Sequence, residues 1–243
     1  MKKKTLITGA GQGIGKAIAE KFAKEDNDLC LLVKKKTEIK SLKLLEKKYH
    51  IKVKVYVGNL KSNNFILKLK KEIPYVDNLI NNAAMANKKF FLDVTNKDLD
   101  NLLSVNLKSI YKLSQIFSKK MIKKKVKGTI VSLSSQLGHV GAYNRTLYSL
   151  TKFGLEGFTK SLALDLAKFG IRAVTVAPTK TIVDESEYKR TPKRLKHIRK
   201  RIPLNQFSTK EQIASIVYFI TTNSAGSITG TSIISDGGWT AGK

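Results

Sequence analysis

The stretch Lys4-Thr-Leu-Ile-Thr-Gly-Ala-Gly-Gln-Gly-Ile-Gly15 joins a short apolar run to a glycine-rich turn. Apolar residues then recur at helical spacing from Ile14 to Phe22, so we predict a strand, a turn and a helix. This arrangement leaves backbone N–H groups at a helix N-terminus, where they can bind a pyrophosphate. The predicted dinucleotide phosphate site consists of Gly9, Gln12, Gly13, Ile14 and Gly15. The glycines are spaced more widely than in G-x-G-x-x-G, so a turn without a ligand is the alternative.

The remaining sequence alternates short apolar runs with segments of helical spacing. The apolar runs predict strands at residues 29–33, 51–57, 78–80, 129–133, 171–177 and 232–235. Helices are predicted between them, including a long one near 99–121 and one at 148–169 that ends at Gly170. Ser208 and Glu211, three residues apart, predict a capping box at the start of the last helix.

These elements fit a single domain. No linker, composition shift or internal repeat divides the 243 residues. Repeated strand–helix units predict an α/β fold over residues 1–243, a Rossmann-type doubly wound parallel sheet that binds ligands at the carboxyl ends of its strands. The run 51–57 alternates apolar and polar residues, which indicates a strand at the edge of the sheet.

The chain is strongly basic, with a net charge of +28 and a pI near 10.1. Such a field attracts nucleic acid, anionic membranes or acidic partners. Lysines are spread over nearly every predicted element, as a codon bias would spread them, so we do not expect a nucleic-acid partner. Most of the arginines, in contrast, lie in the segment 189–201. This cluster favours an anionic substrate or an acidic carrier, and a solvated basic helix is an equal alternative.

Several classes of protein are not expected. No apolar run approaches the roughly 20 residues that span a bilayer, and no signal sequence is evident after Met1, so we expect a cytoplasmic protein without membrane contact. Cys30 is the only cysteine, which leaves no disulfide framework. The three histidines, His50, His139 and His197, are isolated, so neither a metal site nor a Ser-His triad is predicted. His139 is either the wall of a substrate pocket or a loop histidine.

The residues after the second predicted strand bear on the choice of cofactor. Enzymes that use NAD usually carry an acidic residue about 20 positions after the glycine turn, which binds the ribose hydroxyls. This chain has Val33-Lys-Lys-Lys36 there, with Lys34 and Lys35 beginning the loop. We therefore predict that NADP(H) is preferred over NAD(H). Gln12 holds a position where a basic residue would have strengthened this prediction.

Tyr148 and Lys152 are four residues apart, which places both on one face of a predicted helix. A cation close to a phenol lowers its pKa and makes tyrosine a better acid–base catalyst. Such pairs are common on helix surfaces. Here, however, Ser135 ends the preceding strand, Asn106 lies in the long helix, and Asn81-Asn82-Ala83 follows another strand.

Together these motifs resemble the short-chain dehydrogenase/reductase family over essentially the whole chain. Thr8 to Gly15 resembles the glycine turn of the family, Asn81-Asn82-Ala83 its Asn-Asn-Ala-Gly, and Tyr148 with Lys152 its Tyr-x-x-x-Lys. Two positions differ, because Ala84 and Thr179 stand where the family usually has glycine.

The resemblance implies catalytic roles for Asn106, Ser135, Tyr148 and Lys152. Tyr148 would donate a proton to a carbonyl oxygen that Ser135 binds. Lys152 would lower the pKa of Tyr148 and bind the nicotinamide ribose, and Asn106 would hold a water relay to Lys152. The resemblance further implies cofactor contacts from Asn59, Leu60, Asn82, Ala83, Tyr148, Lys152, Pro178 and Thr181.

The resemblance also limits the substrate without fixing it. The substrate would be a small-molecule or carrier-bound carbonyl compound, as in 3-oxoacyl-acyl-carrier-protein reductases, and sugar and polyol dehydrogenases resemble the chain nearly as well. A homotetramer or a homodimer is implied. An alternative of another class is a non-catalytic nucleic-acid-binding protein on a Rossmann scaffold. The presence of all four predicted catalytic residues argues against this alternative, because a protein that only binds nucleic acid does not need them.

Overall fold

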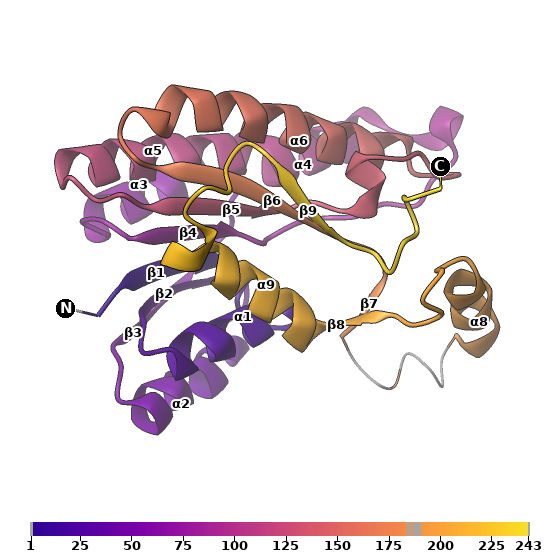
Figure 1. The fold of residues 1–243 in the computed structure, drawn as a ribbon. Helices are drawn as coiled ribbons and strands as arrows, with labels where there is room; N and C mark the ends of the chain where they lie inside the picture. The colour runs from indigo at the N-terminus through magenta and orange to yellow at the C-terminus, as the bar shows by residue number, and fades with distance from the viewer. Residues whose placement is uncertain (1, 184–185, 187–190, 243) are drawn as a thin grey trace.

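The computed structural model describes residues 2–183, 186 and 191–242 of the chain. Its centre is a seven-stranded parallel sheet in the order β3-β2-β1-β4-β5-β6-β9 (Figure 1). The strands are β1 (Lys4–Thr8), β2 (Asp28–Val33), β3 (Val53–Val57), β4 (Asn78–Asn81), β5 (Thr129–Leu133), β6 (Arg172–Pro178) and β9 (Ser232–Ser235). The predicted doubly wound sheet is confirmed. Its strand order reverses between β1 and β4, and such a switch point opens a crevice for ligands.

Helices cover both faces of the sheet (Figure 1). One face carries α1 (Gly13–Lys24), α2 (Ile39–Tyr49) and α9 (Lys210–Ile220), and the other carries α3 (Asn63–Glu72), α4 (Asn96–Leu103), α5 (Ser109–Lys123) and α6 (Thr146–Ala167). Each face has its own apolar core, with Phe22 fully buried in the first and Phe117 in the second. Because both faces are covered, the central strands are continuous apolar runs.

The position of β3 agrees with its alternating sequence. Among the described residues it pairs only with β2. Val53 is buried while Lys54 is exposed. This confirms the predicted edge strand.

The long helix predicted near 99–121 is interrupted. A π-helical turn, Ser104–Lys108, separates α4 from α5 and contains Asn106. Such turns insert a residue into an α-helix and occur frequently at functional sites. Helix α6 begins at Thr146, two residues before the predicted start, and the chain turns at Gly170 with a left-handed φ of +69° as the glycine there predicts.

The predicted capping box of α9 is wrong by one residue. The Thr209 hydroxyl, not that of Ser208, accepts from the Gln212 N–H, and the Gln212 side chain accepts from the Thr209 N–H. The strand β8 (Ser208–Thr209), which pairs with β7 (Thr181–Ile182), continues through Thr209, so α9 begins at Lys210 and Thr209 becomes its N-cap.

Most of the arginine-rich segment forms α8 (Pro192–Lys200), whose position is at the far end of the molecule from α2 (Figure 1). Its first two residues, Lys189 and Arg190, lie outside the described residues. In the described part of the chain, no helix is long and apolar enough to cross a membrane.

Candidate active site

A cleft of about 800 Å³ opens at the carboxyl ends of β1, β2 and β4. It is lined by ten of the predicted cofactor residues: Gly9, Gln12, Gly13, Ile14, Gly15, Lys34, Asn59, Leu60, Asn82 and Ala83. The other five, Lys35, Tyr148, Lys152, Pro178 and Thr181, do not line it. The structure therefore brings the predicted glycine turn together with Lys34, Asn59 and Leu60 in one cleft.

The glycine turn has the shape that a bound pyrophosphate needs. Gly9 and Gly13 adopt left-handed φ values of +66° and +55°. A Cβ at Gly15 would overlap the carbonyl oxygen of Gly9. Gln12, the N-cap of α1, makes no side-chain cap, so its side chain does not occupy the first N–H groups of the helix. An uncapped helix N-terminus beside glycines fits an anionic phosphate group.

Asn82 braces this turn from the neighbouring strand. Its Nδ2 donates to the carbonyl oxygens of Thr8 at 3.0 Å and Gly9 at 3.1 Å. In return, the Thr8 hydroxyl accepts from the backbone N–H groups of Asn82 and Ala83, both at 2.9 Å. The side chain of Asn82 thus holds the end of β1 against the end of β4.

An acidic side chain that the sequence analysis did not single out lies in this cleft. Glu38 lines it together with Lys34, and a Cβ added to Gly11 would overlap the Glu38 carboxylate. Glu38 Oε2 accepts from the backbone N–H of Lys35 at 3.1 Å. No acidic residue stands directly after β2, as the sequence shows, but the Glu38 carboxylate reaches this corner because the chain turns back after Lys35. No capping-box pattern pointed to Glu38, because a lysine at position 35 has no side-chain acceptor.

The predicted catalytic residues come from three segments around α6. Ser135 follows β5 and caps the 3-10 turn Gln136–Gly138, accepting from the Leu137 N–H at 3.2 Å. Tyr148 and Lys152 lie in the first two turns of α6, and Asn106 lies in the π-helical turn.

The phenol of Tyr148 stays protonated near neutral pH. Burial raises its pKa, which a hydrogen bond with Ser135 and the positive charge of Arg145 partly offset. The expected lowering of this pKa by Lys152 is wrong for this structure, because the desolvation of the phenol outweighs the neighbouring charges. The Lys152 Nζ lies 5.5 Å from the centroid of the Tyr148 ring.

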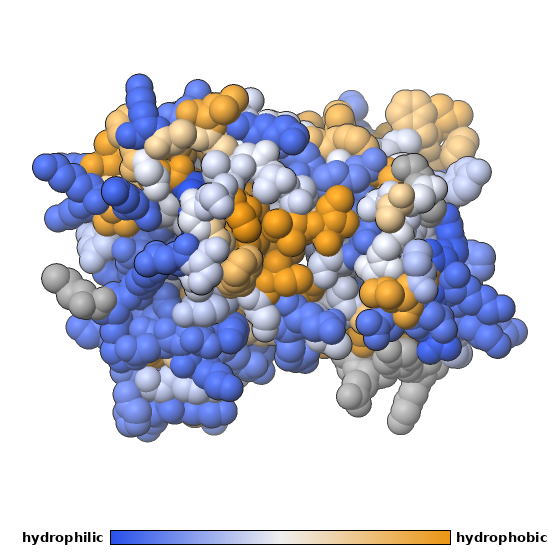
Figure 2. All heavy atoms as spheres, viewed as in Figure 1, coloured by the Kyte–Doolittle hydropathy of each residue, from blue (hydrophilic) through white to orange (hydrophobic). Residues whose placement is uncertain are grey.

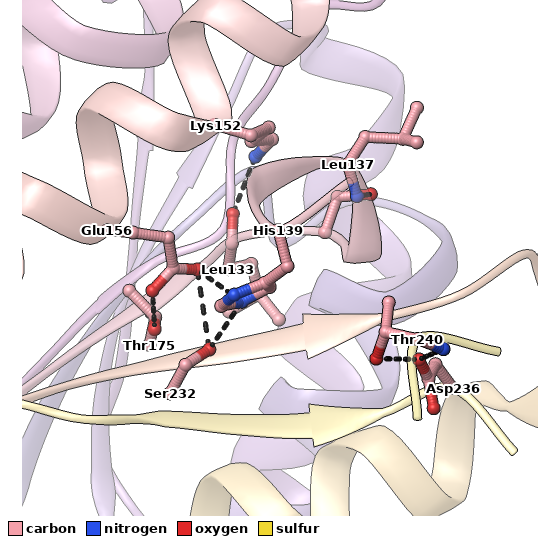
Figure 3. Close-up of polar contacts among 10 residues, drawn as sticks. Leu133, Leu137, His139, Lys152, Glu156, Thr175, Ser232, Asp236 and Thr240 are labelled. Carbon is pink, nitrogen blue, oxygen red and sulfur yellow. Dashed lines mark hydrogen bonds and ion pairs between the residues drawn. The ribbon is translucent and has the colours of Figure 1, made fainter. Parts of the chain in front are cut away.

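Lys152 is completely buried, with 1% of its surface exposed. Its Nζ donates to the carbonyl oxygen of Leu133 at 2.6 Å (Figure 3). Burial lowers the pKa of Lys152 to about 8, against the attraction of Glu156, which raises it. An ammonium group in such surroundings is able to exchange its proton close to physiological pH.

Asn106 ties two parts of the site together. Its Oδ1 accepts from the Met85 N–H at 2.8 Å, and its Nδ2 donates to the Met85 carbonyl at 2.8 Å and to the Thr151 hydroxyl at 3.1 Å. The buried side chain thus fixes the loop after β4 against α6. The water relay remains a prediction.

The predicted residues after β6 lie beside the C-terminal strand. Pro178 ends β6, and the next residue, Thr179, donates its backbone N–H to the Ser235 carbonyl at 3.1 Å. The Thr181 hydroxyl donates to the Thr179 carbonyl at 3.3 Å. Thr179 stands where the family usually has glycine, and both its backbone N–H and its carbonyl are hydrogen-bonded.

His139 does not line the cleft. Its Nε2 lies 3.1 Å from the Ser232 hydroxyl and 3.3 Å from Glu156 Oε1 (Figure 3). It directly follows the 3-10 turn Gln136–Gly138 and faces a buried carboxylate. Within the described residues, no three His, Cys, Asp or Glu side chains gather as a metal site.

Comparison with known proteins decides the family. Residues 9–240 match the family model described as Enoyl-(Acyl carrier protein) reductase. The chain belongs to the short-chain dehydrogenase/reductase family. It is an oxidoreductase of this family, with the fold and the glycine turn that the family uses to bind nicotinamide cofactors.

Its relatives within the family differ in substrate. A 3-oxoacyl-[acyl-carrier-protein] reductase of Buchnera aphidicola is 34% identical, over 98% of this chain and 97% of its own. The L-xylulose reductase of Mus musculus is 31% identical, with the same coverage of 98% and 97%. A solved structure provisionally named NAD(P) dependent gluconate 5-dehydrogenase, from Beutenbergia cavernae with bound NADP, has a TM-score of 0.90 at 26% identity, covering 98% of this chain and 97% of that one.

Proposed function

We propose that the chain interconverts a ketone and a secondary alcohol with NADP(H), using Asn106, Ser135, Tyr148 and Lys152. The observation that carries the proposal is the buried Lys152 one helical turn from Tyr148. A fully buried lysine is rare in a protein core, and its lowered pKa of about 8 is typical of a functional site.

In the proposed reduction, the hydroxyl of Ser135 binds the carbonyl oxygen of the substrate. Tyr148, which burial keeps protonated near neutral pH, donates its proton to this oxygen. The ammonium of Lys152 then stabilises the phenolate that remains. Bound NADPH supplies the hydride for the carbonyl carbon. In the reverse direction, the Tyr148 phenolate accepts the alcohol proton.

A tyrosine-to-phenylalanine variant tests this assignment. Tyr148→Phe is expected to abolish turnover while NADPH still binds with its wild-type dissociation constant, because the phenol is removed without changing the glycine turn. The matched control is Tyr143→Phe, whose side chain is 97% exposed. A Tyr148→Phe variant that keeps a tenth of the wild-type rate would contradict the assignment.

The proposed preference for NADP(H) over NAD(H) is supported by Lys34, which lines the cleft near the glycine turn. An ammonium there attracts a 2′-phosphate. The carboxylate of Glu38 at Gly11 opposes it, so the preference depends on Glu38 turning away from a bound phosphate. A Michaelis constant lower for NADH than for NADPH would refute the preference.

For the substrate, we propose a 3-oxoacyl thioester on an acidic carrier, as the name of the Buchnera aphidicola relative suggests. The basic residues of α8 support it, among them Arg194 and Arg199, and Figure 2 shows hydrophilic side chains over this end of the molecule. Activity on an acetoacetyl thioester that falls sharply with added salt is expected. Selective oxidation of a sugar or polyol would favour the alternative that the Mus musculus relative represents.

A second copy of this chain is the proposed protein partner. Large apolar side chains are exposed on α5 and α6, namely Tyr111, Leu150, Phe153 and Leu164. We propose that they pack in a homotetramer or homodimer located in the cytoplasm, and sedimentation tests the assembly. Nucleic acid is not a proposed partner. Duplex binding at physiological salt, together with no NADPH oxidation on any ketone, would reverse this ranking.

A further inference from the structure

A buried carboxylate lies behind Lys152. Glu156 is one turn further along α6 and only 8% exposed. Its Oε2 accepts from the Thr175 hydroxyl of β6 at 2.6 Å, and its Oε1 lies 3.3 Å from both the Ser232 hydroxyl of β9 and His139 Nε2 (Figure 3). Three segments that are distant in the sequence thus surround one carboxylate, which the proposed reaction does not use directly.

Three groups that can donate a hydrogen bond surround the Glu156 carboxylate. The hydroxyls of Thr175 and Ser232 can both donate to it. His139 Nε2 lies 3.1 Å from Ser232 as well as 3.3 Å from Glu156. A hydrogen on Nε2 gives every atom of this cluster a partner, whereas a lone pair there would face a carboxylate oxygen. Three donors around one buried carboxylate stabilise its negative charge.

This negative charge acts on Lys152. Within the described structure, the Lys152 ammonium donates its hydrogen bond to the neutral carbonyl of Leu133. Residues four apart share a helix face, so the Glu156 side chain lies on the same side of α6 as Lys152. Its attraction raises the pKa of Lys152 against the effect of burial. Thr175 and Ser232 are uncharged, so Lys152 and His139 are the titratable groups that face Glu156 among the described residues.

We propose that Glu156 is a positioning residue, whose buried carboxylate keeps Lys152 in its ammonium form near neutral pH. The inference rests on the proposed function, in which this ammonium stabilises the Tyr148 phenolate. Thr175, Ser232 and His139 together hold the carboxylate in place inside the protein, and its charge does not depend on any one of these contacts. Without Glu156, Lys152 would lose its proton at a lower pH.

The test follows urea unfolding, which needs neither substrate nor cofactor. The difference in unfolding free energy between the wild type and Lys152→Met is measured from about pH 6 to about pH 11. The pH at which this difference begins to fall is its onset, and it reports the folded-state pKa of Lys152, about 8. In a Glu156→Gln background the onset is expected to move down by roughly one pH unit. The matched control is Thr175→Val, which removes a buried hydrogen bond to the same carboxylate but keeps its charge; its onset is expected to stay in place.

An onset that is unchanged in Glu156→Gln, or that moves equally in Thr175→Val, would overturn the positioning role. If Glu156→Gln does not fold, the 13C resonance of the Glu156 carboxyl in the wild type replaces it. That resonance is expected to shift as Lys152 loses its proton, at about pH 8, and to lose this step in Lys152→Met; a resonance without a step there overturns the proposal.

The outcome is separable from the proposed function. A shifted onset in a chain that reduces no ketone would keep the Glu156–Lys152 coupling and refute the redox chemistry. With an active substrate in hand, the alkaline limb of kcat/KM is expected to move down in Glu156→Gln and to stay in place in Thr175→Val.

Discussion

Replacing Lys152 by methionine is expected to make the protein more stable at neutral pH while it abolishes turnover. The side chain is completely buried and protonated below its folded-state pKa of about 8. Methionine has a similar length and is apolar, so it fills the same space without a charge. The protein therefore carries an unfavourable buried charge at the position where we propose that catalysis needs one.

The magnitude follows from the pKa of Lys152, which falls from 10.5 to about 8 on folding. At about 1.36 kcal/mol per unit, this corresponds to roughly 3 kcal/mol of lost stability when the lysine is protonated. The Leu133 carbonyl loses its donor in the variant, which costs about 1 kcal/mol. A net gain of about 2 kcal/mol is expected for Lys152→Met at pH 7.

The sign of the pH dependence is fixed by the same shift. The unfolded chain binds the proton more tightly than the folded one between pH 8 and pH 10.5, so wild-type stability recovers as the pH rises through this interval. The advantage of Lys152→Met is therefore full below pH 8 and is lost by pH 10.5. Urea unfolding of the two proteins at neutral and alkaline pH measures it.

Lys160→Met is the matched control, because Lys160 is an exposed residue of the same helix. Its effect on the free energy of unfolding is expected to stay within about 0.5 kcal/mol at either pH. A Lys152→Met variant that is less stable than the wild type at pH 7, or a difference that does not change with pH, would refute the reasoning.

Three further substitutions test the rest of the site. Gly15→Ala is expected to destabilise the fold by about 1–3 kcal/mol, because the new Cβ overlaps the Gly9 carbonyl; unchanged urea unfolding would contradict this packing. Glu38→Gln removes a negative charge beside Gly11, so it is expected to lower the dissociation constant of NADPH several-fold and to leave that of NADH unchanged in a fluorescence titration. An equal change for both cofactors would argue against a contact between Glu38 and the 2′ position of the cofactor. Asn106→Ala is expected to cost about 1–3 kcal/mol in thermal or urea unfolding, because both backbone groups of Met85 lose their partners, and a neutral result would show that this loop is held otherwise.

The sequence predicted the features that depend on neighbours along the chain. Periodicity of apolar residues predicted the order of strands and helices, and alternation at residues 51–57 predicted the edge strand. The glycine turn depends on left-handed backbone conformations at Gly9 and Gly13, which glycine adopts without steric cost. The four-residue spacing of Tyr148 and Lys152 placed both on one helix face. These are short-range effects, so a single sequence contains them.

The tertiary structure decided the electrostatics, because desolvation and charge partners come from segments distant in the sequence. The spacing of Tyr148 and Lys152 suggested that the lysine lowers the tyrosine pKa, yet burial beneath the surrounding elements raises it. Glu38 reaches Gly11 only because the chain turns back after β2. No pattern in the sequence distinguishes Glu156 from the other residues of α6. Only the fold brings Thr175 of β6 and Ser232 of β9 to its carboxylate. Local sequence pattern determined where the proposed catalytic side chains lie along the chain, and tertiary packing determined the direction in which their pKa values shift.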